Sequence, residues 1–383
     1  MKELQDVLDQ AVAAGDVPFA VGMAGNSAGI TFQGSAGEAA TGRAADLDTV
    51  FRIFSMTKAI GSLAAMILID RGKLSLDTPV EDVLPAWGRL QVLDGWDGDS
   101  PRLRAPRTKA TIRHLATHTS GVEYEFWNDQ MPRFMEATGH PTVLSGMNVS
   151  LEQQPLMSDP GTRWGYGQSI DWLGKVVEAV SGQSIVDFCQ SEIFDPLGMA
   201  STGFEVTEDM ARRMADVKAR GEDGAFAPFE LAPPSKPEFY GMGHALYSTA
   251  PDYMRFLRMV LNKGTLDGAK ILSPEAVAEM TADQMNGLTL TKMITMAPPV
   301  TADFEPFPGT RVVHSVAFMR NEEDIPGKRS AGSQSWAGVL NSHYWIDPAK
   351  DVAAVIMTQS LPFVEERFMK TYDAYERAVY ANL

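Results

Sequence analysis

Cysteine is almost absent from this sequence, since Cys189 is the only one among 383 residues. One cysteine excludes an internal disulfide and permits a reducing compartment. The composition, 44% hydrophobic and 21% charged, is typical of a folded globular protein. At this length we expect a large core and two subdomains.

Basic residues are also scarce: 33 Lys and Arg stand against 49 Asp and Glu, a formal net charge of -16. Proteins that bind nucleic acid or anionic membranes concentrate Lys and Arg in one patch. No such cluster is visible here, so both partners are excluded and a small-molecule partner is expected. The oligomeric state stays open.

Long apolar runs are lacking as well. The longest covers residues 63–69, far too short to span a bilayer. The first residues carry apolar side chains at helical spacing and have no signal-peptide core. The expected location is therefore cytoplasmic, although a leader cleaved from a longer precursor stays open.

The elements that are present predict an α+β fold, with strands near both ends of the chain and helices and loops between them. We expect an antiparallel sheet in an α/β sandwich domain formed by residues 1–75 and 240–383, and a mainly helical domain formed by residues 76–239. The expected strands cover residues 19–25, 30–34, 338–346 and 352–358. The expected helices cover residues 1–15, 55–70, 170–180, 184–193, 251–263 and 362–383, with a proline-rich loop at 298–308.

The tetrapeptide Ser55-Met56-Thr57-Lys58 follows an apolar run and opens a helical one. A serine and a lysine three positions apart share one helix face, about one turn from each other. This spacing lets an amine act on a hydroxyl, so Ser55 is a candidate nucleophile and Lys58 a candidate proton shuttle. The alternative is a helix N-cap serine followed by a surface lysine.

Two further motifs suggest other chemistry. Residues 25–29 match G-x-S-x-G around Ser27, but an alternating, strand-like stretch follows, so a hairpin turn explains them better than a nucleophile elbow. His114 and His118 have the i, i+4 spacing of a zinc pair, but the glutamate of H-E-x-x-H and a third ligand are missing. We expect hydrogen-bonded structural histidines there, with no metal and no cofactor.

Tyr166 follows a Pro-Gly turn, has glycines on both sides and precedes a helix. Small neighbours allow its side chain to reach into a cleft, where a nearby cation would favour a phenolate that acts as a base. A packed loop aromatic is the alternative. Residues 332–339, which include Trp336, combine small residues with a strand pattern and could let a substrate approach closely. The alternative is a loop with a packed tryptophan.

Three segments, in this order, resemble the serine β-lactamase and penicillin-binding-protein superfamily, and more narrowly the family VIII carboxylesterases: Ser55-Met56-Thr57-Lys58, Tyr166-Gly167-Gln168 and Trp336-Ala337-Gly338. Flanking stretches agree along most of the chain, at residues 114–121, 160–161, 248–253 and 344–348. The resemblance implies a β-lactamase/transpeptidase-like fold with the active site in the cleft between the two domains.

The resemblance also implies roles for these residues. Ser55 would be the nucleophile, Lys58 and Tyr166 the base network, and the backbone amides of Ser55 and Val339 the oxyanion hole. The remaining motif positions, Gln168, Trp336, Ala337 and Gly338, would bind substrate.

Two departures from the family pattern bear on the substrate. Gln168 stands where the lactamase-like motif has asparagine, and Trp336 replaces the lysine that faces a substrate carboxylate. The sequence therefore predicts a serine carboxylesterase for neutral, short-chain esters, working through an acyl-enzyme. Weak β-lactamase or peptidase activity, amide hydrolysis and acyl transfer stay open, and so does a non-catalytic ligand-binding relative.

Overall fold

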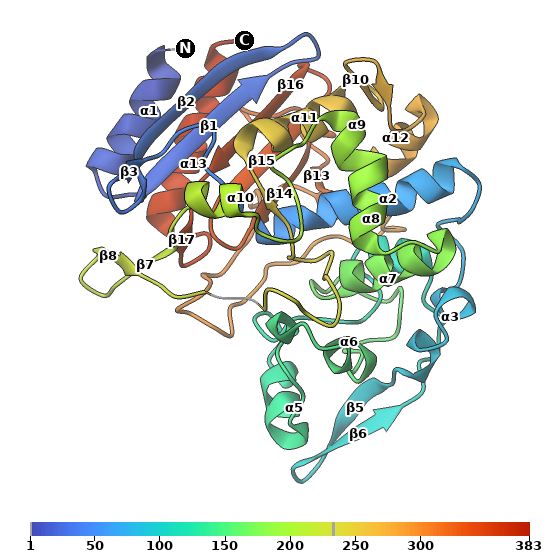
Figure 1. Cartoon of the computed structure of the whole chain (residues 1–383). Coiled ribbons are helices and arrows are strands. Elements are labelled where there is room, and N and C mark those ends of the chain that lie inside the picture. The colour runs from blue at the N-terminus through green and yellow to red at the C-terminus, as the bar shows by residue number, and fades with distance from the viewer. Residues whose placement is uncertain (1, 232–233) are drawn as a thin grey trace.

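The computed structural model describes residues 2–231 and 234–383, and its main feature is an antiparallel eight-stranded sheet built from both ends of the chain (Figure 1). The strands lie in the order β12-β13-β14-β15-β16-β1-β2-β3. Their bounds are β1 Phe19–Gly25, β2 Ile30–Ala40, β3 Arg43–Ala44, β12 Val312–His314, β13 Met319–Asn321, β14 Gln334–Gly338, β15 Ser342–Asp347 and β16 Val352–Met357.

Helices cover both faces of this sheet. The terminal helices α1 (Lys2–Ala13) and α13 (Glu366–Ala381) pack together on one face, while α2 (Thr57–Asp70) and α11 (Ala250–Leu261) lie on the other (Figure 1). Alternate residues of one strand serve the two cores: Phe19 and Val21 point toward α2 and α11, Ala20 and Ala24 toward α1 and α13. The central strands are therefore apolar on both faces.

The middle of the chain is mainly helical but also contains small hairpins. Two of these are β5–β6 (Val92–Asp97 and Ser100–Arg104) and β7–β8 (Lys218–Arg220 and Phe226–Pro228). Shorter strands are β4 Phe51–Arg52, β9 Tyr247–Ser248, β10 Thr265–Leu266, β11 Ala269–Lys270 and β17 Ser360–Leu361. The helices are α3 Val80–Val83, α4 Ile112–Ala116, α5 Gln130–Thr138, α6 Val149–Glu152, α7 Ser169–Ser181, α8 Ile185–Cys189, α9 Asp195–Leu197, α10 Glu208–Arg213 and α12 Pro274–Thr281.

The expected fold class is confirmed, since an antiparallel sheet with helices on both faces accompanies a largely helical middle segment. The sequence prediction is wrong in several details. The hairpins β5–β6 and β7–β8 were expected as loops and helices, a turn after Gly338 divides the strand expected at 338–346, and the last helix starts at Glu366 rather than at 362. The domain boundaries stay a prediction. Within residues 2–231 and 234–383, no helix has the length and apolar character needed to cross a membrane.

Candidate active site

Ser55 lies in a single 3-10 turn, Phe54–Met56, directly before α2. Phe54 has a φ of 41°, a left-handed conformation that costs a non-glycine residue on the order of 1–3 kcal/mol. The turn places Ser55 Oγ 3.0 Å from Lys58 Nζ. The expected juxtaposition of serine and lysine is therefore present in the structure.

The amine of Lys58 is buried and lies among three oxygen atoms. It donates to Ser55 Oγ at 3.0 Å, to the Tyr124 hydroxyl at 3.0 Å and to the Gly243 carbonyl at 2.8 Å. These three oxygen atoms fix the position of the amine next to the serine hydroxyl. Because α2 is apolar almost all round, the lysine side chain is held in one place rather than solvated.

Tyr124 is one of two residues that sequence analysis missed. Burial, together with the nearby carboxylate of Asp171, raises the pKa of the Tyr124 phenol well above its ordinary value. The phenol therefore keeps its proton and suits a donor better than a base. Its backbone N–H donates to the Tyr166 carbonyl at 3.0 Å, which ties the two loops together. Only its position three residues after the 114–121 stretch could have marked it.

Asp171, on α7, supports the lysine through the backbone. Its Oδ1 accepts a hydrogen bond of 2.8 Å from Gly243 N–H, and the Gly243 carbonyl in turn accepts from Lys58. Asp171 is itself buried. No sequence pattern predicts this link between Asp171 and Lys58, because it passes through the backbone of Gly243, 72 residues from Asp171.

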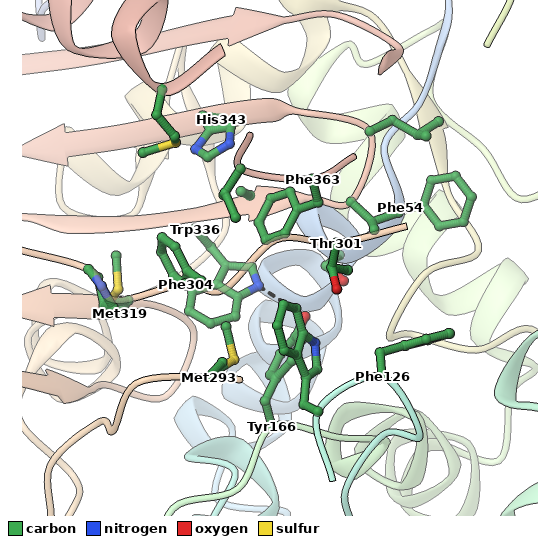
Figure 2. A pocket seen from close by; sticks show the side chains of 18 of the residues that line it. Phe54, Phe126, Tyr166, Met293, Thr301, Phe304, Met319, Trp336, His343 and Phe363 are labelled. Carbon is green, nitrogen blue, oxygen red and sulfur yellow. Dashed lines mark hydrogen bonds between the residues drawn. The ribbon is translucent and has the colours of Figure 1, made fainter. Parts of the chain in front are cut away.

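Tyr166 faces Lys58 with its ring rather than with its hydroxyl. Lys58 Nζ lies 4.8 Å from the ring centre, while the Tyr166 hydroxyl accepts a hydrogen bond of 3.2 Å from Trp336 Nε1 (Figure 2). The glycines on either side are needed here, since a Cβ at Gly165 or Gly167 would lie 2.3 Å from neighbouring atoms. The small residues were thus a valid signal for a closely packed tyrosine.

Strand β14 brings its predicted residues to the same place. Trp336, Ala337 and Val339 line the cavity that also contains Ser55. Gly338 lies against the backbone before the nucleophile, where a Cβ would stand 2.4 Å from the Ile53 carbonyl. Gln168 is buried at the start of α7, and its Oε1 finds no partner among the residues described. It is not among the side chains that line this cavity.

The cavity has a volume of about 430 Å³, within the size range of small-molecule sites. Ser55, Tyr124, Tyr166 and Trp336 form one part of its wall. Most of the remainder is apolar and includes Trp127 and Phe307. Figure 2 shows six more of these apolar residues: Phe54, Phe126, Met293, Phe304, Met319 and Phe363.

The other candidate motifs lie elsewhere or have structural roles. Ser27 sits in the turn between β1 and β2, where its hydroxyl donates to Asp351 Oδ2 at 2.7 Å. His114 Nδ1 accepts from the Thr111 backbone N–H and helps to cap α4. His118 is buried with its ring 4.9 Å from that of Tyr166. Across the described chain, no group of three or more His, Cys, Asp or Glu residues could hold a metal.

Taken together, the geometry has the parts of a nucleophilic site. A hydroxyl lies within hydrogen-bond distance of an amine, two phenols surround that amine, and an apolar cavity opens beside the hydroxyl. Such a set suits attack on a carbonyl carbon followed by transfer of the acyl group.

Comparison with known proteins points to one family. The family model described as Beta-lactamase matches residues 4–378. The lovastatin esterase of Penicillium rubens is 30% identical over 327 residues, which cover 82% of this chain and 80% of that protein. Monacolin J acid methylbutanoyltransferase of Aspergillus terreus is 28% identical over 354 residues, which cover 88% and 83% of the two chains.

Solved structures agree with the sequence comparison. Simvastatin synthase (LovD) of Aspergillus terreus, as its LovD6 mutant, superposes with a TM-score of 0.85 at 26% identity. The match covers 99% of this chain and 94% of that one. The fold is therefore that of the β-lactamase and transpeptidase group throughout the molecule.

Proposed function

This chain belongs to the Beta-lactamase family of serine hydrolases and acyltransferases, and on that premise we propose that it is a serine carboxylesterase acting on neutral, apolar esters. The observation that carries the proposal is the contact of 3.0 Å between Ser55 Oγ and Lys58 Nζ at the wall of an apolar cavity. Within the superfamily, the Trp336-Ala337-Gly338 segment favours the family VIII carboxylesterases.

In the proposed reaction, Ser55 Oγ bonds to the ester carbonyl carbon while its proton passes to the pair formed by Lys58 and Tyr166. The bond to the alcohol oxygen then breaks as that pair returns the proton to the leaving group. Water enters in place of the alcohol and repeats the steps, which releases the acid and restores Ser55. No cofactor or metal is needed for this sequence.

Tyr124 has a different role in this proposal. Its phenol, held protonated by burial, accepts a hydrogen bond from Lys58 and so helps to fix the position of the amine. We assign the proton transfer to Tyr166 and the positioning of Lys58 to Tyr124 and to the Gly243 carbonyl.

The negative charge that develops on the carbonyl oxygen needs preorganised donors. We assign these to the backbone N–H groups of Ser55 and Val339. The support is the close approach of β14 to the Ser55 turn at Gly338, together with the presence of both residues at the cavity wall.

The substrate class follows from the cavity and from Trp336. The indole N–H is already used by the Tyr166 hydroxyl, so Trp336 offers a substrate only its apolar face. A carboxylate would find no cation at that position, which disfavours β-lactams. The short-chain preference expected from sequence stays a prediction, although a cavity of about 430 Å³ also has room for longer acyl groups.

Acyl transfer to an alcohol is the second candidate, because the relatives named above include both an esterase and a methylbutanoyltransferase. The two activities share the acyl-enzyme and differ in which nucleophile releases the acyl group. Amide hydrolysis differs only in the leaving group. A non-catalytic binding protein is disfavoured, since it would have no need of Ser55, Lys58 and Tyr166 in contact.

The experiment is a turnover assay with a p-nitrophenyl ester and a cephalosporin, each with and without an added small alcohol. An esterase releases p-nitrophenol and free acid, and the free acid stays the main product when the alcohol is added. Formation of the new ester as the main product would assign the chain as an acyltransferase. Cephalosporin turnover above ester turnover would refute the proposal.

A further inference from the structure

The cavity continues beyond the catalytic candidates to a second region beside α13, which we call the inner end. Figure 2 shows His343 on the opposite side of Trp336 from Tyr166, with Phe304 and Phe363 nearby. His343 stands across from Ala337 in the pairing of β14 with β15. Since side chains alternate along a strand, His343, Ala337 and Ser335 share the sheet face that α13 covers, while Trp336 points toward the candidate catalytic residues.

Three polar groups at this inner end are buried without hydrogen-bond partners among the described residues. They are Ser335 Oγ, His343 Nε2 and Arg329 Nη1, and all three residues line the cavity. Each of these side chains is more than nine-tenths buried. A buried polar atom without a partner costs free energy, so three of them around one cavity indicate a missing hydrogen-bonding group.

Two of these groups, His343 and Arg329, both contact Tyr372 of α13. The His343 ring lies 4.6 Å from the ring of Tyr372, and the Tyr372 hydroxyl accepts from Arg329 Nη2 at 2.7 Å. Burial and the neighbouring Arg329 lower the pKa of His343 to about 3, so its imidazole is neutral. The inner end is therefore a polar patch in a wall that is mostly apolar.

The charges select a neutral ligand group. Arg329 Nε pairs with Glu376 Oε1 at 2.7 Å, and Lys328 Nζ pairs with Asp373 Oδ1 at 2.9 Å. Arg377 also pairs with Asp373, at 2.8 Å, but it does not line the cavity. The charged lining residues are two cations, Lys328 and Arg329, and three carboxylates, Asp303, Glu305 and Asp373, so no net positive charge remains for an anion. The free atoms include a guanidinium N–H, which only donates, and a hydroxyl, which can donate. Their complement is an oxygen that only accepts.

We propose that the inner end of this cavity binds a neutral carbonyl oxygen carried on the apolar acyl group of the substrate, through Ser335, His343 and Arg329. The inference rests on the proposed esterase function and narrows its substrate class from apolar esters to keto-acyl or similar esters. The ester carbonyl would lie at Ser55 and the second carbonyl beyond Trp336.

The test compares p-nitrophenyl octanoate with keto-octanoates that carry the keto group at the fifth, sixth or seventh carbon. At one of these positions kcat/KM should exceed that of the plain octanoate by about three- to tenfold, the gain typical of neutral hydrogen bonds. In Ser335→Ala and in His343→Phe the ratio of the two kcat/KM values should fall to about one. Ser62→Ala is the matched control, because it also removes a buried unpartnered hydroxyl but lies on α2 away from the cavity wall.

A binding measurement distinguishes the failure of this inference from the failure of the proposed function. In Ser55→Ala, tryptophan fluorescence titrations with methyl octanoate and the methyl keto-octanoates measure affinity without turnover. Failure of every octanoate to react in wild type would refute the esterase, yet tighter keto-ester binding would still support the carbonyl site. Two results would overturn the inference. One is that the plain octanoate and all the keto-octanoates have equal kcat/KM values and equal affinities, and the other is that the advantage of a keto-octanoate persists in Ser335→Ala.

Discussion

At the scale of single residues, the buried amine of Lys58 connects every candidate catalytic group. It contacts Ser55, Tyr124 and the Gly243 carbonyl through hydrogen bonds, and it contacts Tyr166 through the face of the ring. Removing any one of these groups changes the environment of the same amine. The effects of substitutions here should therefore be coupled rather than independent.

Lys58→Ala and Tyr166→Phe should each lower kcat by on the order of 10³ or more, because both remove part of one proton-transfer unit. The double variant should be little worse than either single one. Tyr124→Phe should cost less, about ten- to a hundredfold, since it removes a positioning contact. Steady-state kinetics of wild type and these four variants on one ester provide the measurement. Additive losses, or a larger loss for Tyr124→Phe than for Tyr166→Phe, would contradict these roles.

Trp336 should determine the preference for neutral substrates. A charge-assisted pair with a carboxylate is worth roughly 1.5–3 kcal/mol, or about ten- to 150-fold in affinity. Trp336→Lys should therefore raise binding of a cephalosporin and lower turnover of a p-nitrophenyl ester. Trp336→Phe is the control: it keeps an apolar face but loses the N–H that holds the Tyr166 hydroxyl, so it should lower kcat without favouring carboxylates. Unchanged substrate ratios in Trp336→Lys would show that this position does not select substrates.

At the scale of elements, the site depends on how closely β14 approaches the turn before α2. At Gly338 a Cβ would stand 2.4 Å from the Ile53 carbonyl, and a backbone atom cannot move aside as a flexible side chain can. The strand end that carries Val339 therefore tolerates only glycine at this point.

Gly338→Ala should displace the strand end and lower kcat by at least tenfold, because a misplaced oxyanion donor costs on the order of 10²-fold or more. Gly29→Ala is the matched control, since no atom lies within 4 Å of the Cβ that it would add. Kinetics and thermal unfolding of both variants measure the effect. Wild-type kcat in Gly338→Ala would show that the close approach is not required.

Element by element, the sequence was informative where one local pattern decides the structure. The short apolar stretch at 19–25 and the apolar run after Ser55 correspond to β1 and α2. It was misleading at residues 92–104, where helices and loops were expected but the hairpin β5–β6 forms. Pairing between strands is a property of the tertiary structure, so the turn that separates β14 from β15 also had no local signal.

The candidate site shows the same limit. Ser55, Lys58 and Tyr166 carry recognisable spacing and neighbours, and the structure brings them together. Tyr124 and Asp171 act through contacts between loops distant in sequence, which no single window of sequence contains. Family resemblance supplied the assignment of Val339, because a backbone amide leaves no signature in residue type.

At the scale of the whole molecule, the histidines make folding stability depend on pH. Burial lowers the pKa of all six, to about 4 for His314 and about 3 for His343. The unfolded chain, with histidine pKa values near 6.5, then binds protons that the folded chain does not. This stability is fully present above pH 6.5 and is lost as the pH falls toward 4.

The free energy of unfolding should thus decrease from pH 7 to pH 5. Glu123 and Asp252 partly offset this decrease, because burial raises their pKa values. Each fully buried histidine can contribute up to about 1.4 kcal/mol per pH unit. Urea unfolding of wild type and His314→Gln at pH 7, 6 and 5 measures the slope. The variant should show a shallower dependence, and equal slopes would exclude a contribution from His314.

The central claim is that Ser55 carries the acyl group, and intact-mass analysis tests it most directly. Wild type treated with a fluorophosphonate, or briefly with a p-nitrophenyl ester, should gain the mass of one phosphonyl or acyl group on the peptide containing Ser55. Ser27→Ala should be labelled like wild type, and Ser55→Ala should stay unlabelled while keeping its fold by circular dichroism. Labelling of Ser55→Ala, or a modified peptide that contains Ser27 instead of Ser55, would contradict the account.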